Sequence, residues 1–262
     1  MADFLNTILN QRRNDVAEAK AAEPLATLKP RAEAARAGRR SFAAALRNPE
    51  PVGIVAEIKR ASPSKGDLAP DLDPALLARA FKAGGAAALS VLTEPRFFKG
   101  SVADLTAARG AVRLPVLRKD FLFDDYQIVE SAAMGADAVL LIVRILPQAD
   151  LARLHKLALE LGLDALVEAA DPEEVKRACD IGAVLIGINT RDLQTFKIDP
   201  DRAARLAPPP APGRVVLSLS GVATRADIDR QRGAGLTRFL VGESLVRAPD
   251  PAAALRALKG SR

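Results

Sequence analysis

Cysteine, histidine and tryptophan are almost absent from this chain of 262 residues, and each absence excludes a class of chemistry. The single cysteine, Cys179, excludes an internal disulfide and argues against a cysteine-based metal site. We interpret it as a helix packing residue rather than a nucleophile. The single histidine, His155, lies in the helix-like segment LARLHKLALELG, away from any motif. A Ser-His-Asp relay and a histidine-rich zinc site are therefore poor explanations of this sequence.

Long apolar runs are also missing, and none approaches the roughly 20 residues that a membrane-spanning helix needs. The N-terminal segment has the pattern of an amphipathic helix, with Leu5, Ile8 and Leu9 along one face. It lacks the basic start and the apolar block of a secretory signal. We therefore expect a cytoplasmic protein without a membrane partner.

The net charge of +6 does not indicate a nucleic-acid partner. Basic residues are mixed with acidic ones, as in RRNDVAEAK, and the chain has no tryptophan and one tyrosine to stack on bases. A solvated, arginine-rich surface is the simpler interpretation. The excess of positive charge still favours a small anionic ligand such as a phosphate. We expect a phosphorylated small-molecule substrate, no nucleic acid, and a monomer or weak homo-oligomer.

Eight short apolar runs recur along the chain, and each is followed by a helix-like segment. The runs are residues 52–58, 86–92, 115–119, 137–143, 164–168, 183–189, 214–220 and 237–242. Apolar strands that alternate with helices indicate a parallel sheet covered by helices. Eight such units in this length predict a single (β/α)8 barrel, a TIM barrel of the α/β class. No GxGxxG motif follows the first run, which weakens the dinucleotide-binding alternative.

The chain shows no linker or low-complexity boundary, so we expect one domain over residues 1–262. Residues 1–48 precede the first predicted strand and should form one or two extra helices. These helices form an N-terminal extension that we expect at the bottom of the barrel.

Polar residues stand at the ends of five predicted strands, where barrel enzymes place their chemistry. The strand-end residues are Glu57, Lys59, Lys119, Glu168, Asn189, Arg191, Ser220 and Gly221. Buried charge without a partner is costly, so these side chains should be paired or face a wet cavity. Simpler alternatives stay open: a structural Glu57–Lys59 ion pair, a surface Lys119, a surface Glu168, or a turn held by Asn189.

Two glycine-containing strand ends resemble a phosphate-binding site. Ser220-Gly221 follows the seventh predicted strand, and Gly242-Glu243 follows the eighth. The loops after these two strands of a barrel often bind phosphate through backbone N–H groups, which glycine lets come close to the ligand. Ser62 and Lys65 of the first loop are placed to close over the same group. A pair of ordinary tight turns is the alternative.

The segments resemble, in order along the chain, the indole-3-glycerol-phosphate synthase family of tryptophan biosynthesis. The matching strings are AEIKRASPSKG (56–66), ALSVLTEPRFFKGS (88–101), PVLRKDF (115–121), YQIVESAAMGADAVLLI (126–142), LVE (166–168), LIGINTRDLQTF (185–196) and FLVGESL (239–245). The combination of EIKRASPSKG with LRKDF is highly specific. The resemblance covers nearly all of the predicted barrel, and the family also has an N-terminal extension.

The resemblance implies a lyase that acts on 1-(2-carboxyphenylamino)-1-deoxyribulose 5-phosphate. The family closes a pyrrole ring and expels CO₂ and water, without a cofactor or metal. It implies that Lys119 is the general acid and Glu168 its acid/base partner, with Glu57 as a further catalytic carboxylate that orients Lys59. The other implied roles are substrate carboxylate contacts for Lys59 and Arg191, sugar contacts for Asn189, anthranilate-pocket walls for Phe98 and Phe121, and phosphate contacts for Ser62, Ser220, Gly221, Gly242 and the Glu243 backbone.

One position departs from the family pattern. The family usually has a glutamate at the position of Leu219, and leucine neither ionises nor forms side-chain hydrogen bonds. Three alternatives follow: Glu57 compensates, the enzyme is slow, or the function has changed. Two alternatives lie outside the family. One is another sugar-phosphate enzyme, such as an isomerase or an aldolase that forms a Schiff base at Lys119, and the other is a non-catalytic phosphate-binding barrel.

Overall fold

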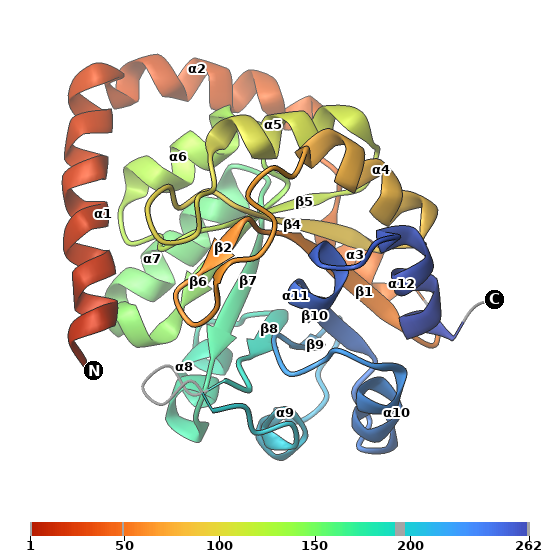
Figure 1. The fold of residues 1–262 in the computed structure, drawn as a ribbon. Helices are drawn as coiled ribbons and strands as arrows, with labels where there is room; N and C mark the ends of the chain where they lie inside the picture. Colours follow the sequence, from red (N-terminus) through yellow and green to blue (C-terminus); the bar gives the residue numbers. More distant parts are fainter. Residues whose placement is uncertain (1, 49, 192–196, 261–262) are drawn as a thin grey trace.

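Eight parallel strands close into a barrel in the computed structural model, which describes residues 2–48, 50–191 and 197–260 (Figure 1). The strands are β1 (Gly53–Ile58), β4 (Ala88–Leu92), β5 (Val116–Lys119), β6 (Ala138–Ile142), β7 (Asp164–Ala169), β8 (Leu185–Ile188), β9 (Val215–Ser218) and β10 (Arg238–Val241), and β10 pairs with β1. Each predicted run holds one of these strands, except that β7 extends one residue beyond its run, so the TIM-barrel prediction is confirmed.

Helices follow the strands and surround the barrel (Figure 1). They are α4 (Pro74–Ala83), α5 (Val102–Ala111), α6 (Asp125–Ala133), α7 (Gln148–Glu160), α8 (Pro172–Asp180), α9 (Arg202–Leu206), α10 (Arg225–Gly233), α11 (Glu243–Val246) and α12 (Pro251–Lys259), with a 3-10 turn at Val143–Ile145. Six of them start at a residue whose side chain accepts a backbone N–H: Asp73, Ser101, Asp124, Asp171, Thr224 and Asp250. Such caps satisfy donors that the first helical turn leaves free. Within the described ranges, no helix combines the length and the apolar character needed to cross a bilayer.

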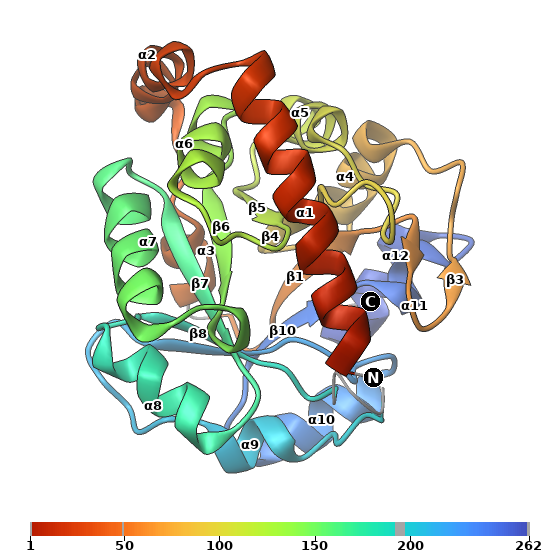
Figure 2. The same ribbon diagram turned by 90° about the vertical axis from the view of Figure 1, so that its left-hand side faces the viewer.

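The N-terminal extension contains more helices than expected, and only part of it reaches the barrel bottom. Its elements are α1 (Ala2–Ala22), α2 (Leu25–Ala35), a 3-10 turn (Arg36–Gly38) and α3 (Phe42–Arg47). Phe42 and Leu46 of α3 are buried with the interior side chains of the barrel and close its bottom. Helix α1 instead runs along the side of the barrel (Figure 2), where the Tyr126 hydroxyl donates to carbonyls at its C-terminal end. The prediction of a bottom cap is correct for α3 and wrong for α1.

The interior side chains lie in layers of four, each supplied by alternate strands, because the strands are progressively staggered. One layer contains Val55, Leu117, Leu166 and Leu217, and the next contains Ser90, Leu140, Gly187 and Leu240. The layer above, at the carboxyl ends of the strands, contains Glu57, Lys119, Glu168 and Leu219. The interior therefore changes from apolar to charged at this end of the barrel. We call this last set the charged layer.

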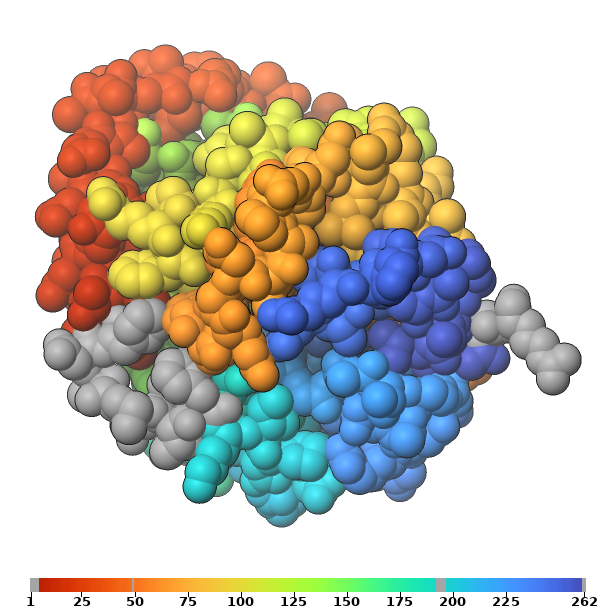
Figure 3. All heavy atoms as spheres, viewed as in Figure 1, coloured from red at the N-terminus to blue at the C-terminus, as the bar shows by residue number. Residues whose placement is uncertain are grey.

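A small hairpin that the sequence pattern did not predict forms in the loop after β1. Strand β2 (Ala61–Ser62) pairs antiparallel with β3 (Gly66–Asp67). Gly66 has φ of +64°, a conformation that glycine adopts without strain. The loop lies across the middle of the face shown in Figure 3, and it brings Ser62 and Lys65 to the mouth of the barrel.

Candidate active site

A cavity of about 930 Å³ opens at the carboxyl ends of the strands. This is the end of a (β/α)8 barrel where active sites are found, and the volume suits a small-molecule ligand. The structure brings every candidate residue named from the sequence into its lining: Glu57, Lys59, Ser62, Phe98, Lys119, Phe121, Glu168, Asn189, Arg191, Ser220, Gly221, Gly242 and Glu243. These residues lie far apart along the chain, and the barrel gathers them at one mouth.

Glu57 and Lys59 form a close ion pair at the floor of this cavity. Lys59 Nζ lies 2.5 Å from Glu57 Oε1, and the Glu57 side chain is almost fully buried. Burial alone would raise the pKa of Glu57, but the charges of Lys59 and Lys119 and the hydrogen bond from Lys59 outweigh it. The pKa of Glu57 is therefore below its ordinary value, and the carboxylate is ionised at neutral pH. The pair also lines the cavity, so it can contact a ligand as well as stabilise the barrel.

Lys119 and Glu168 face each other more loosely across the same floor. Lys119 Nζ lies 3.9 Å from Glu168 Oε2, beyond hydrogen-bond distance, and neither side chain is at the outer surface of the protein. Both groups line the cavity, so the surface alternatives for Lys119 and Glu168 do not hold. An oxygen atom beside this pair, rather than between its members, can lie within hydrogen-bond distance of both groups.

A hydrogen-bonded cluster fixes the orientation of Asn189. Its Nδ2 donates to Glu168 Oε1 at 3.0 Å, while its Oδ1 accepts from Ser220 Oγ at 3.0 Å and from the backbone N–H of Arg191 at 3.0 Å. Thr190 Oγ1 in turn donates to the carbonyl of Ser220 at 2.7 Å. Asn189 therefore holds a turn, which was the simpler alternative for this residue, and it also binds the carboxylate of Glu168.

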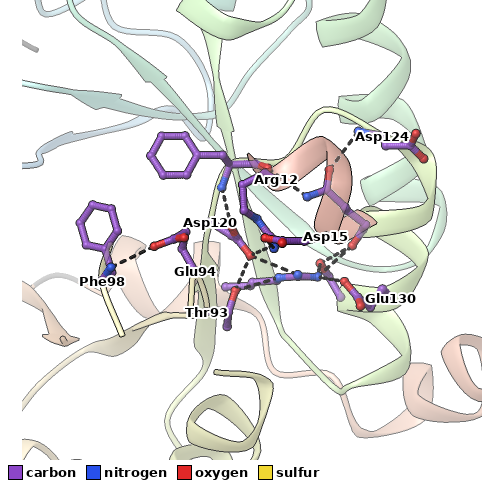
Figure 4. A network of polar contacts seen from close by, with 12 residues as sticks. Arg12, Asp15, Thr93, Glu94, Phe98, Asp120, Asp124 and Glu130 are labelled. Carbon is purple, nitrogen blue, oxygen red and sulfur yellow. Dashed lines mark hydrogen bonds and ion pairs between the residues drawn. The ribbon is translucent and has the colours of Figure 1, made fainter. Parts of the chain in front are cut away.

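Two phenylalanines form an aromatic wall. The ring centroids of Phe98 and Phe121 are 6.3 Å apart, with 44° between the planes. Glu94, which the sequence analysis did not single out, is fully buried, and its carboxylate accepts the backbone N–H groups of Arg96, Phe97 and Phe98 at 3.0, 2.7 and 2.9 Å. Figure 4 shows the contact with Phe98. It fixes the loop that carries Phe98. The signal was available, because Glu94 stands just after an apolar run, as the other strand-end residues do.

The glycines proposed for phosphate binding are required by close packing. Gly221 has φ of +81°, and a Cβ there would lie 2.7 Å from Ile198 Cγ2. A Cβ at Gly242, which precedes α11, would lie 2.5 Å from Glu57 Oε1. A side chain at position 242 would therefore displace the catalytic candidate Glu57.

Further residues line the cavity that the sequence analysis did not assign to it. Leu5 and Ile8 extend the wall from helix α1, which lies beside the barrel mouth in Figure 2. Arg230 and Arg247 add positive charge at the rim. Sequence alone gave no signal for these contacts, because they depend on where α1 and the last loops dock.

The described residues contain no group of three or more His, Cys, Asp or Glu side chains placed to hold a metal ion. The lining offers lysines, arginines and hydroxyl groups, which bind anions.

A family model described as "Indole-3-glycerol phosphate synthase" matches residues 5–258, which is nearly the whole chain. The chain belongs to the indole-3-glycerol phosphate synthase family. A curated relative named indole-3-glycerol phosphate synthase, from Desulfosudis oleivorans, is 51% identical over 98% of this chain and 99% of its own length. Another of the same name, from Syntrophobacter fumaroxidans, is 48% identical over 100% and 99%. The predicted resemblance is confirmed.

Solved structures of other proteins have the same barrel fold. A 3-hexulose-6-phosphate synthase from Salmonella typhimurium superposes with a TM-score of 0.62, covering 80% of this chain and 97% of that one, at 14% identity. At that identity the likeness supports the barrel alone. The last five residues of the LIGINTRDLQTF string, 192–196, lie outside the described residues.

Proposed function

We propose that this barrel converts 1-(2-carboxyphenylamino)-1-deoxyribulose 5-phosphate into indole-3-glycerol phosphate. The chain belongs to the synthase family, whose reaction is a decarboxylating ring closure. The observation that carries the proposal is the separation of Lys119 from Glu168 within a cavity that also has an aromatic wall. Such a cavity offers a proton donor, a proton acceptor and an apolar surface for a ring.

In the proposed reaction, the aromatic carbon that bears the carboxylate attacks the sugar carbonyl carbon. Lys119 donates a proton to the carbonyl oxygen as the new C–C bond forms. The C–CO₂⁻ bond then breaks, CO₂ leaves, and its electron pair restores the aromatic ring. Glu168 assists the loss of the hydroxyl group as water and the removal of a proton that completes the pyrrole ring. Atoms and charge balance without an oxidant or reductant.

The remaining lining residues are proposed to hold the substrate in this orientation. Phe98 and Phe121 flank the anthranilate ring, and Lys59 and Arg191 contact its carboxylate. Glu57 orients Lys59 through their ion pair and completes the catalytic set. Asn189 contacts the sugar hydroxyls. The phosphate contacts are proposed for Ser62, Ser220, Gly221, Gly242 and the backbone N–H of Glu243.

The test is a fluorescence assay for indole formation from the carboxyphenylamino-deoxyribulose phosphate, with EDTA present throughout. We expect turnover that survives EDTA and is lost in Lys119→Ala. Absence of turnover in the wild-type chain and in Leu219→Glu would overturn the proposal in favour of another substrate or a non-catalytic barrel. Trapping of a covalent adduct at Lys119 by borohydride with a keto-sugar phosphate would instead favour a Schiff-base aldolase.

We also propose that residues 1–262 act as one domain in the cytoplasm, as a monomer or weak homo-oligomer, with residues 1–48 as a helical extension. The contacts of α3 with the barrel interior support this arrangement. Light scattering over a range of protein concentrations tests the oligomeric state.

A further inference from the structure

Glu94 binds the loop between β4 and α5 through both its side chain and its backbone. Its Oε1 accepts the N–H of Arg96 at 3.0 Å, and its Oε2 accepts those of Phe97 and Phe98 at 2.7 and 2.9 Å. Its carbonyl accepts the N–H of Gly100 at 2.9 Å, near the end of the loop. The path of this loop is therefore set largely by one buried residue.

The position of the Phe98 ring depends on the backbone of this loop. Phe98 is only partly buried, whereas Glu94 has no exposed surface, so core packing fixes Glu94 more closely than it fixes Phe98. Lys99, the next residue, has φ of +53°, a conformation that is uncommon for a residue other than glycine. Such a conformation persists only where surrounding contacts hold it. The hydrogen bonds to Glu94 are contacts of this kind, and they direct Phe98 towards the cavity that it lines.

The other ring of the aromatic wall is fixed by the same kind of contact. The N–H of Phe121 donates to Oδ1 of the buried Asp120 at 2.8 Å, and Asp120 follows β5, the strand that pairs with β4. The distance of 6.3 Å between the ring centroids therefore depends on two carboxylates. Asp120 also binds buried arginines, whereas the side-chain hydrogen bonds of Glu94 within the described residues all go to the loop. Substitution of Glu94 is therefore the more selective way to disturb the wall.

Position 94 requires a group that accepts hydrogen bonds and donates none. Both oxygens of a carboxylate accept, and its charge strengthens the bonds. A glutamine has nearly the same size, but its NH₂ group would face either the N–H of Arg96 or those of Phe97 and Phe98. At least one hydrogen bond would then be replaced by a contact between two donors, while the volume of the core stays the same.

We propose that Glu94 is a positioning residue for the reaction and that it acts through Phe98. Its carboxylate holds the loop in the conformation that places the Phe98 ring against the aromatic ring of the substrate. This inference rests on the proposed function, because it assumes a substrate with an anthranilate ring. The contact with that ring is made both before and during the reaction, so its loss should raise KM more than it lowers kcat.

The test is a double-mutant cycle that combines Glu94→Gln with Phe98→Leu, measured by steady-state kinetics with the carboxyphenylamino-deoxyribulose phosphate. We expect Glu94→Gln to raise KM about tenfold, the equivalent of one lost hydrogen bond to a charged group, and to leave kcat within about threefold of the wild type. In the Phe98→Leu background, Glu94→Gln should raise KM by less than about twofold, because the ring through which it acts is gone.

The matched control is Asp137→Asn, which alters a buried carboxylate at the amino end of β6, the opposite end of the barrel from the cavity. Asp137 accepts the N–H groups of Arg40 and Val116 at 2.9 Å each and a hydrogen bond from Arg109 at 3.1 Å. Asp137→Asn should lower the melting temperature but leave KM within about twofold of the wild type. Thermal unfolding of every variant verifies that the kinetics are measured on folded protein.

Three results would overturn the inference and leave the proposed function standing. They are an unchanged KM in Glu94→Gln, a rise of about tenfold that persists in the Phe98→Leu background, and an equal rise in Asp137→Asn. If Glu94→Gln does not fold, Glu94→Asp replaces it in the cycle, because aspartate keeps the charge but is one methylene too short to reach all of the N–H groups. KM should then rise about threefold, and only where Phe98 is present.

The failure of the proposed function gives a different result. If turnover requires Leu219→Glu, the cycle is measured in that background. Absence of turnover in both the wild-type chain and Leu219→Glu would overturn the proposed function, and this inference with it.

Discussion

Strand β5 carries charge on both of its faces, and the two sets are paired in different ways. Asp120, at its carboxyl end, faces away from the cavity and is fully buried. Its Oδ2 accepts from Arg12 at 2.9 Å, Thr93 Oγ1 at 2.7 Å and Arg118 at 3.2 Å, and its Oδ1 accepts the Phe121 N–H at 2.8 Å (Figure 4). These four hydrogen bonds match the roughly four acceptor sites of a carboxylate.

Arg118 is satisfied in the same way, whereas Lys119 beside it is not. Arg118 donates to Glu130 at 2.7 Å, Ser131 at 3.0 Å and the carbonyl of Gln127 at 3.2 Å. Lys119 faces the cavity, where its carboxylate neighbour is 3.9 Å away. Buried charges whose hydrogen bonds are all made within the protein hold α1, β5 and α6 together, whereas the loosely paired Lys119 is available to a ligand.

The largest expected effect is on activity, at the loosely paired lysine. Lys119→Met removes the proposed acid and keeps much of the apolar stem, so kcat/KM should fall by about 10³-fold. The melting temperature should change by only a few degrees, because the nearest carboxylate to Lys119 Nζ among the described residues is that of Glu168, 3.9 Å away. Steady-state kinetics and thermal unfolding check both statements. A large loss of stability would show that Lys119 belongs to the structural set instead.

The next effect is on stability, at the saturated carboxylate. Asp120→Asn leaves Arg12 and Arg118 buried without their shared counter-charge and should lower the free energy of unfolding by about 3–5 kcal/mol. Urea titration measures it. The matched control is Asp125→Asn, which breaks an exposed pair with Arg153 and should cost about 1 kcal/mol or less. Equal losses in the two variants would contradict the contrast between the clusters.

Gly242→Ala should have a smaller effect, on the side of β1 and β10 that faces the cavity. The new Cβ would lie 2.5 Å from Glu57 Oε1, the atom that Lys59 contacts, so the Glu57 carboxylate must shift and its ion pair with Lys59 is disturbed. We expect a cost of about 1–2 kcal/mol and a fall of about tenfold in kcat/KM. The control is Gly110→Ala in helix α5, where a Cβ meets nothing within 4 Å, and it should stabilise the protein slightly. Unchanged kinetics in Gly242→Ala would mean that the position of Glu57 is unimportant.

The strands were predictable because parallel strands buried on both faces form continuous apolar runs. The strand-end residues were predictable because a charged side chain such as Lys119 or Glu168 at the end of an apolar run cannot be explained by core packing. The partners of Asp120 were not, because Arg12 is more than a hundred residues away and its contact depends on where α1 docks. The neighbours of Leu219 in the charged layer required the stagger of all eight strands, which no local pattern encodes.

The smallest predicted effect is the pH dependence that Glu57 contributes to stability. Its pKa in the folded state is lowered, so the unfolded chain binds more protons in acid than the folded one does. The resulting stabilisation is fully present above the ordinary glutamate pKa and is lost as the pH falls through the lowered value. Glu57→Gln should therefore show a flatter fall in unfolding free energy below about pH 4.5. Because Lys59 and Lys119 cause the lowering, Lys59→Met should flatten the wild-type curve in the same direction. Urea titrations across this pH range would contradict the assignment if all three curves had the same slope.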